Sequence, residues 1–152
     1  MNEDKSKAID YVKKGDRKLL IDDYSGALTD YTQAIMLRPE FADAYFNRGR
    51  AKQGLGDYQG AIADYSKAVD LEPAHAKHYC FRGGIKSDHN DYHGGIGDFT
   101  KAVELDPNYA MAYFNRAMAF LGIGRKLEAL SDFLKAKESG IRIPQGIWDK
   151  CV

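Results

Sequence analysis

The chain repeats itself every 34 residues, and this period constrains the fold more than any single motif does. Aromatic and small side chains recur in register in four successive units. The aromatic columns are Tyr11, Tyr45, Tyr79 and Tyr113, and Tyr31, Tyr65, Phe99 and Phe133. The small-residue columns are Gly15, Gly49, Gly83 and Ala117, then Ala27, Ala61, Gly95 and Ala129, then Ala34, Ala68, Ala102 and Ala136. A unit of this size cannot bury a core alone and must stack on its neighbours.

This order of aromatic, small, small and aromatic residues, closed by a proline in the first three units, resembles the tetratricopeptide repeat. The resemblance divides the chain into repeats at about 8–41, 42–75, 76–109 and 110–143, with a C-terminal cap at 144–152, in a single domain of residues 1–152. It implies an all-α fold, in which antiparallel helix pairs stack into a right-handed superhelical solenoid. Such an array offers a long concave surface to a partner.

The second repeat illustrates how each unit is expected to fold. Its first helix should span about 41–55 and its second about 58–71, with the turn at 56–57. Pro73 should end the second helix, because the residue before a proline is pushed out of the helical region. In the C-terminal cap, Trp148 is expected to cover the apolar end of the fourth repeat, since arrays need terminal caps for solubility.

A pattern of charges accompanies the repeat. Each second helix carries an aspartate just before its aromatic residue, and each first helix carries a cation just before its small residue. The aspartates are Asp30, Asp64, Asp98 and Asp132, and the cations are Lys14, Arg48, Arg82 and Arg116. A feature repeated four times in register is more typical of structure than of a functional site. The sequence therefore predicts one ion pair per repeat, with close contacts at Arg48–Asp64, Arg82–Asp98 and Arg116–Asp132.

Composition narrows the range of partners. The 22 basic and 22 acidic residues balance, so there is no basic field to attract nucleic acid or an anionic membrane. The first ten residues lack the apolar segment of a signal peptide. The two cysteines, Cys80 and Cys151, lie in separate repeats, which argues against a disulfide framework and for a reducing compartment. We therefore expect a cytoplasmic protein that binds neither nucleic acid nor membranes.

In the tetratricopeptide family the first helix of each repeat lines the groove, and the resemblance therefore identifies candidate contact residues. The candidates for partner binding are Phe46, Asn47, Arg50, Lys77, Phe81, Met111, Phe114, Asn115 and Met118. Phenylalanine and methionine on a wet surface are typical of interaction sites. They predict an adaptor or scaffold that binds a peptide or helix of a partner protein in its concave, Phe/Met/Asn-lined groove. The alternative is a structural element that forms a homo-oligomer through its array ends or grooves.

Two further comparisons with the family concern the ligand. Asn47 and Asn115 occupy the same place in repeats two and four, where an amide can pair with the backbone of a peptide. Chaperone-binding members hold a C-terminal carboxylate with lysines, asparagines and an arginine, and the matching positions here are Val12, Asp16, Asn47, Lys77 and Phe81. Only Asn47 and Lys77 agree, and Asp16 would repel a carboxylate. Binding of a chaperone C-terminal tail is therefore not expected.

No catalytic, cofactor-binding or metal site is expected, and the sequence predicts a protein that is not an enzyme. It contains no GxSxG, P-loop or HExxH motif. His89 and His93 have the spacing of two ligands on one helical face, and with Asp91 they would make a minimal metal site. A turn is predicted between them, however, and it interrupts the helix that this spacing requires. The sequence therefore favours exposed histidines in a loop.

Overall fold

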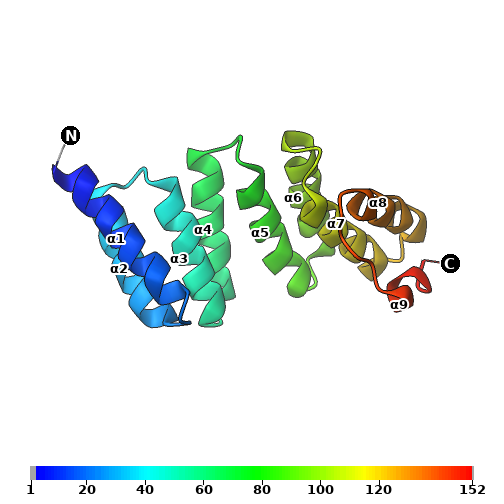
Figure 1. The fold of residues 1–152 in the computed structure, drawn as a ribbon, viewed down its shortest axis with the longest axis horizontal. Helices are drawn as coiled ribbons and strands as arrows, with labels where there is room; N and C mark the ends of the chain where they lie inside the picture. The colour runs from blue at the N-terminus through cyan, green and yellow to red at the C-terminus, as the bar shows by residue number, and fades with distance from the viewer. Residues whose placement is uncertain (1–2, 152) are drawn as a thin grey trace. The chain divides into compact units, whose positions relative to one another are not determined.

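The computed structural model describes residues 3–151, and all regular secondary structure within this range is helical (Figure 1). The chain forms two compact units, residues 1–73 and 74–152. The first contains α1 (Glu3–Leu19), α2 (Tyr24–Leu37), α3 (Ala42–Gly54) and α4 (Tyr58–Leu71). The second contains α5 (Ala76–Asp88), α6 (Tyr92–Leu105), α7 (Ala110–Gly122), α8 (Lys126–Glu138) and α9 (Gln145–Trp148). The predicted all-α class is confirmed. None of the described helices has the length and apolar content needed to cross a membrane.

The second helices of the first three repeats begin at an aspartate cap. A carboxylate oxygen accepts a hydrogen bond from the backbone N–H three residues further on, at 2.9 Å in each case, in the pairs Asp23–Gly26, Asp57–Gly60 and Asp91–Gly94. Such a cap satisfies one of the free N–H groups in the first helical turn. Helix α8 differs, since Arg125 precedes it and makes no side-chain cap.

Small residues allow the two helices of a repeat to approach each other closely. A Cβ atom on Gly15 would lie 2.7 Å from the ring of Tyr31, and one on Gly49 would lie 2.8 Å from the ring of Tyr65. Each ring therefore occupies the space that the missing side chain leaves, and a larger residue would force the helices apart. The aromatic residues of these columns, Tyr31, Tyr65, Phe99 and Phe133, are fully buried.

The three predicted arginine–aspartate pairs are confirmed. In each one a guanidinium from the first helix makes two hydrogen bonds to the aspartate on the second helix of the same repeat. The shortest N–O distances are 2.7 Å for Arg48–Asp64, 2.6 Å for Arg82–Asp98 and 2.6 Å for Arg116–Asp132. Because the aspartates are buried, these bonds specify the alignment of the helices more than they add net stability.

A lysine one turn further along the first helix also reaches the aspartate in three repeats. The Nζ–carboxylate distances are 2.7 Å for Lys18–Asp30, 2.9 Å for Lys52–Asp64 and 2.8 Å for Lys86–Asp98. Lys14, the cation expected for the first repeat, instead lies 5.1 Å above the ring of Tyr11. In the fourth repeat Phe120 holds the lysine position. The aspartate therefore has one cation in repeats one and four and two cations in repeats two and three.

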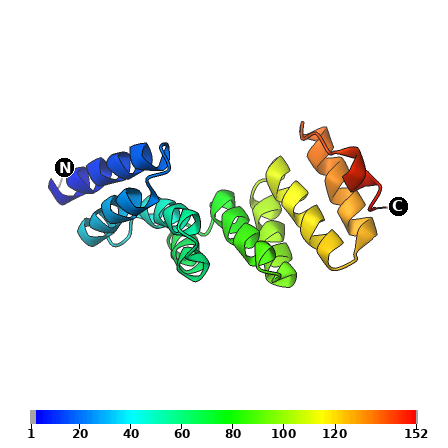
Figure 2. The same cartoon turned by 90° about the horizontal axis from the view of Figure 1, so that it is seen from below.

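The C-terminal segment packs on the second unit. Figure 2 shows α7 and this segment both lying against α8. The ring of Trp148 meets that of Phe133 edge-on, with 6.2 Å between centroids, and Ile143 is buried in the same apolar cluster. The predicted contact of Trp148 with the fourth repeat is confirmed.

Candidate functional site

The first helices of the first unit, α1 and α3, present a polar surface. One carboxylate oxygen of Asp16 accepts hydrogen bonds from the hydroxyl of Tyr31 at 2.8 Å and from the amide of Asn47 at 3.2 Å. The amide of Asn47 is therefore partly engaged within the protein, although its oxygen and its second N–H remain for other partners. Arg50 lies exposed on the same helix as Asn47. This face carries both signs of charge and little apolar surface.

Phe46 does not offer its ring to a partner, and the expectation of an exposed phenylalanine at this position is wrong. The residue is only 4% exposed, and its ring centroid lies 5.5 Å from that of Tyr65 on α4. Phe114 holds the equivalent place in the fourth repeat, and its half-buried ring meets Phe133 on α8 at 5.7 Å. Phe46 and Phe114 therefore pack between the two helices of their repeat, each against the buried aromatic ring of the second helix.

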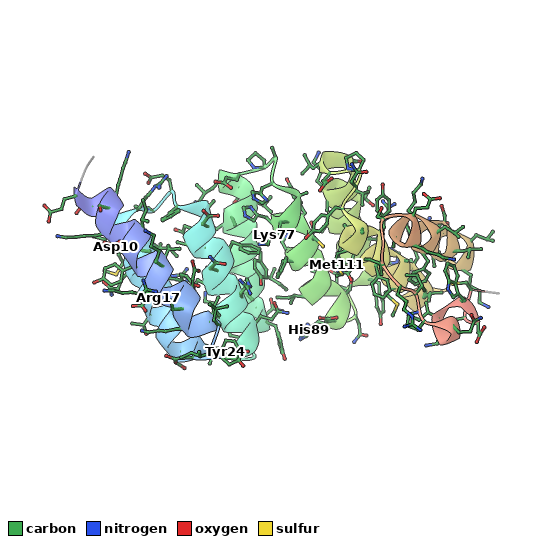
Figure 3. The ribbon with its side chains drawn as sticks, viewed as in Figure 1. Asp10, Arg17, Tyr24, Lys77, His89 and Met111 are labelled. Atoms are coloured by element: carbon green, nitrogen blue, oxygen red, sulfur yellow. The ribbon has the colours of Figure 1, made fainter. Side chains whose placement is uncertain are left out.

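The first helices of the second unit, α5 and α7, present a more apolar surface. Met111 and Met118 are 50% and 41% exposed, respectively, and Phe81 is half-buried. Lys77 on α5 and Met111 on α7 are labelled in Figure 3. The Nζ atom of Lys77 lies 5.9 Å from the centroid of the Phe81 ring, which is within reach of a cation–π interaction.

Between these helices, Asn115 is held by a buried thiol. Its amide nitrogen lies 3.9 Å from Sγ of Cys80, and Tyr109 is hydrogen-bonded to the same thiol. Burial raises the pKa of Cys80, and the two hydrogen bonds oppose that shift only in part. The thiol therefore stays protonated near neutral pH, when it is a poor nucleophile. Cys80 orients Asn115 and leaves the oxygen of its amide available.

A pocket of about 680 Å³ adjoins these residues and is called here the α5–α7 pocket. Its lining includes Gly84, Ser87, Asp88, Asn115, Met118 and Lys150. A Cβ atom added at Gly84 would meet nothing within 4 Å, so the glycine leaves open space rather than a close helix contact. Of the sequence-predicted site residues, the pocket brings together Asn115 and Met118.

Three polar residues of the pocket were not among the sequence candidates. Ser87 lies one turn after Gly84 on α5, and Asp88 is the last residue of that helix. Lys150 follows α9, which packs on α8. The helical spacing between Gly84 and Ser87 could have revealed the serine. No local pattern predicts that Lys150 approaches α5 and α7, because the path of the C-terminal segment decides it.

The α5–α7 pocket has the chemistry of a peptide site. Met118 supplies flexible apolar contact area, which adapts to partners of different shape. Asn115 supplies a hydrogen-bonding group, whereas the buried Ser87 oxygen faces Gly95 on α6, where it has no hydrogen-bond partner among the described residues. Asp88 and Lys150 add one charge of each sign at the edge. Few polar groups in an apolar hollow are what fix the orientation of a bound ligand.

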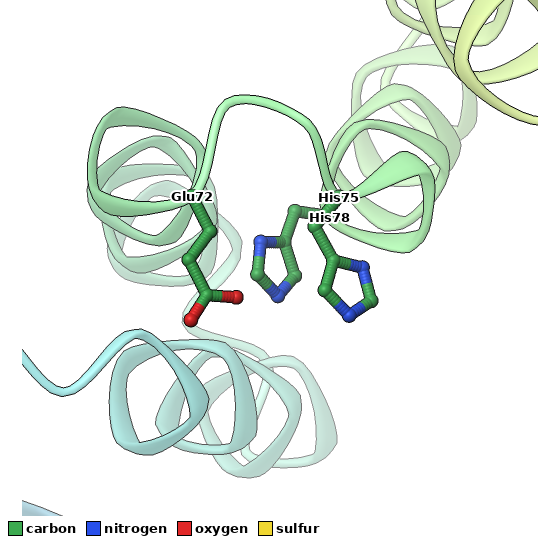
Figure 4. Close-up of side chains that lie close together, drawn as sticks. All are labelled: Glu72, His75 and His78. Carbon is green, nitrogen blue, oxygen red and sulfur yellow. The ribbon is translucent and has the colours of Figure 1, made fainter.

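His89 and His93 are both exposed, as the sequence predicts, and the turn between α5 and α6 separates them, although His93 itself lies in the first turn of α6. Nδ1 of His89 lies 2.9 Å from the carbonyl oxygen of Ile85, so this ring nitrogen is engaged by the backbone at the end of α5. At the start of α5, the rings of His75 and His78 stack with centroids 4.3 Å apart (Figure 4). Figure 4 also draws Glu72, which belongs to the first unit. In the described part of the second unit alone, no third carboxylate, imidazole or thiol completes a three-ligand group with these rings.

Comparison with protein families gives matches in both units. Models described as "Tetratricopeptide repeat" match residues 42–75 and 99–131, and a model described as "TPR repeat" matches residues 15–56. Together they span more than half of the chain. Among curated protein sequences, none matches the chain significantly.

Several solved structures share the fold. The crystal structure of MamA has a TM-score of 0.83 and 24% sequence identity, covering 87% of this chain and 77% of MamA. YrrB, described as a TPR protein with an unusual peptide-binding site, has a TM-score of 0.78 and 24% identity, covering 91% of this chain and 71% of YrrB. The first TPR of Spaghetti (RPAP3), solved with the HSP90 peptide SRMEEVD, has a TM-score of 0.76 and 24% identity, covering 78% of this chain and 94% of that one. At this level of identity, the similarities establish the fold alone.

Proposed function

Because the chain belongs to the tetratricopeptide repeat family, we propose that it is a protein-interaction module that binds an extended peptide of a partner protein in the α5–α7 pocket. The family matches and the peptide-binding neighbours support an interaction role in general terms. One observation supports this pocket in particular: there is open space beside Gly84, and it lies next to the exposed Met118 and the oriented amide of Asn115.

The pocket suggests what kind of peptide it takes. An apolar side chain of the peptide enters the space beside Gly84 and packs on Met118, while its backbone pairs with the amide of Asn115. Lys77, Phe81 and Met111 extend the contact along the same two helices.

The expected affinity is modest. Burying one large apolar side chain contributes about 1.5–3 kcal/mol, and each backbone hydrogen bond adds only about 1 kcal/mol net. Association costs about 4 kcal/mol or more. Two or three apolar anchors therefore give a micromolar or weaker complex, as suits a reversible adaptor. Because apolar contacts dominate, the affinity should depend weakly on salt.

A pair of glycine substitutions tests this proposal. Gly84 on α5 and Gly97 on α6 both have open space where a side chain would point, and both lie inside helices. A leucine at either position should be tolerated by the fold, since it removes a helical glycine. Gly84→Leu fills the α5–α7 pocket, whereas Gly97→Leu is the matched control.

The probe is a peptide selected from a random library on the 152-residue chain and then titrated by calorimetry. We expect Gly84→Leu to weaken its binding by about tenfold or more and Asn115→Ala by about fivefold, and Gly97→Leu to leave the affinity unchanged, because only the first two change the pocket. Equal affinity of wild type and Gly84→Leu would place the peptide elsewhere and refute the proposal.

A chaperone tail should not bind. In the first unit the carboxylate of Asp16 lies where the clamp of chaperone-binding relatives requires an uncharged or basic group, and it is held there by Tyr31 and Asn47. We expect the peptide SRMEEVD, which the Spaghetti domain binds, to show no measurable affinity for this chain. Micromolar binding of that peptide would contradict this assignment.

A further inference from the structure

Helix α8 carries an exposed apolar stripe that the rest of the second unit leaves uncovered. Leu127 is 80% exposed and Leu134 is 47% exposed. They are seven residues apart and therefore lie on the same side of the helix, with the exposed Ser131 between them. Helix α7 and the C-terminal segment pack on other sides of α8, through Ala129, Phe133 and Ala136.

The earlier repeats have polar residues where α8 has these two leucines. The positions that match Leu127 hold Ser25, Gln59 and His93, and those that match Leu134 hold Thr32, Ser66 and Thr100. The threonine hydroxyls receive an arginine of the following repeat, at 3.4 Å for Arg48–Thr32 and 3.1 Å for Arg116–Thr100. Leu134 cannot accept such a bond. The exposed face of α8 therefore lacks the polar group through which α2 and α6 contact the arginine of the following repeat.

Charges beside the stripe indicate what that neighbour is. Successive residues of a helix are about 100° apart, so Glu128 and Lys135 lie together along one flank of the stripe. If two α8 helices pack antiparallel about an axis at Ser131, Leu127 of each meets Leu134 of the other, and Glu128 meets Lys135. A parallel arrangement would instead place Leu127 opposite Leu127 and Leu134 opposite Leu134, and it would leave the Glu128–Lys135 flanks of the two helices on opposite sides of the contact, where they cannot pair. The small side chain of Ser131 allows the helices to approach at the axis.

Both charges are free to change partners. Within one chain Glu128 pairs with Arg125 at 2.7 Å and Lys135 pairs with Glu138 at 3.1 Å, and both contacts are solvent-exposed neighbours on the helix. Exposed pairs of this kind contribute little. We propose that α8 is a self-association surface, on which a second copy of this chain docks antiparallel through Leu127 and Leu134, with Glu128–Lys135 pairs between the copies. This contact is the same on both copies, as a two-fold dimer requires.

The dimer is weak. Helix α8 has 13 residues and is therefore about 20 Å long, too short to bury the roughly 1,200 Å² of a stable interface alone. The dimer should form in the high micromolar range and exchange readily. It uses no residue of the α5–α7 pocket named above, so peptide binding and dimerisation can fail independently.

Sedimentation equilibrium of the full chain tests the proposal. The apparent molecular mass of the wild type should rise from the monomer value of 17.0 kDa towards twice that value as the protein concentration approaches about 1 mM. Leu127→Gln with Leu134→Thr, which restores the residue types of the earlier repeats, should keep the monomer mass throughout. Leu20→Gln removes an equally exposed leucine from the α1–α2 turn and should dimerise like the wild type.

A charge swap tests the antiparallel register. Glu128→Lys alone and Lys135→Glu alone should each weaken the dimer at least about fivefold, because like charges then face each other. The double variant Glu128→Lys/Lys135→Glu should recover the wild-type dissociation constant. A wild type that stays monomeric at the highest concentration, or a double variant no better than the single ones, would overturn the proposal.

Discussion

Removal of the carboxylate of Asp98 is expected to destabilise the second unit more than removal of the carboxylate of Asp132. Both aspartates are buried in the same unit and bonded to an arginine. The difference between them is the second cation. Lys86 lies 2.8 Å from Asp98, whereas Asp132 has Phe120 in the corresponding position.

The magnitude follows from the charges left behind. Removal of one partner from a buried pair costs about 3–5 kcal/mol, and both variants share this cost. In Asp98→Ala, Arg82 and Lys86 also face each other across the vacated site, at most about 6 Å apart, because they lie 2.9 and 2.8 Å from the same oxygen, Oδ2 of Asp98. At an effective dielectric constant of about 20, their repulsion is roughly 3 kcal/mol. Lys86 is 23% exposed and can turn partly towards water, so an excess of about 1–2 kcal/mol should remain.

Thermal unfolding followed by circular dichroism measures the difference. For a chain of this size, 1 kcal/mol lowers the midpoint by about 2–4 °C, so Asp98→Ala should melt about 2–8 °C below Asp132→Ala. Adding Lys86→Phe to Asp98→Ala copies the arrangement of the fourth repeat and should remove this gap. Equal midpoints for the two alanine variants, or no recovery with Lys86→Phe, would refute the reasoning.

Three further predictions concern packing and pH. Gly95→Ala should lower the thermal midpoint, because the added Cβ would collide with the hydroxyl of Ser87, although alanine in a helix is usually more stable than glycine by about 0.5–1 kcal/mol. Adding Ser87→Gly should restore stability. A Gly95→Ala variant more stable than the wild type would contradict this contact. Trp148→Ala should lose at least the ~0.5–1.5 kcal/mol of its ring contact with Phe133, measured by urea unfolding, and an unchanged midpoint would argue against a packed cap. Burial raises the pKa of Tyr31, Tyr65 and Tyr109 above the value of about 10 that tyrosine has in the unfolded chain, so the stability of the protein should be full below about pH 10 and fall above it. Ultraviolet titration should show these three phenols ionising only as the protein unfolds. Early and complete ionisation of all ten tyrosines would disprove the prediction.

The helices and their ion pairs could be predicted because they repeat. A glycine or an aspartate at one position is weak information, but the same residue type at 34-residue intervals identifies one side of a helix. Arg48 and Asp64 were therefore placed opposite each other without knowledge of any distance, and the structure confirms their contact. Lys18 could not be assigned in the same way, since the sequence offered Lys14 as an equally reasonable partner for Asp30.

The binding surface could be predicted only in part. Neighbouring residues on a helix point about 100° apart, so small errors in the assumed orientation decide between the groove and the interior of the helix pair. Phe46 lies on the interior side against Tyr65, whereas Met118 lies on the exposed side. The open space beside Gly84 and the position of Lys150 depend on the tertiary path of the chain, which the repeat pattern does not contain.

The arginine–aspartate pairs also bear on how the chain is made. In each of the three pairs the two residues are separated by 16 positions, so every pair closes within one helix hairpin. A ribosome adds about 5–20 residues per second and therefore takes about 2–7 s to release a whole repeat. Such local contacts form far faster than that. We therefore expect the nascent chain to align each hairpin as it emerges, and each hairpin to become stable when the next repeat stacks on it, so that few unpaired charges and aromatic side chains are exposed at a time.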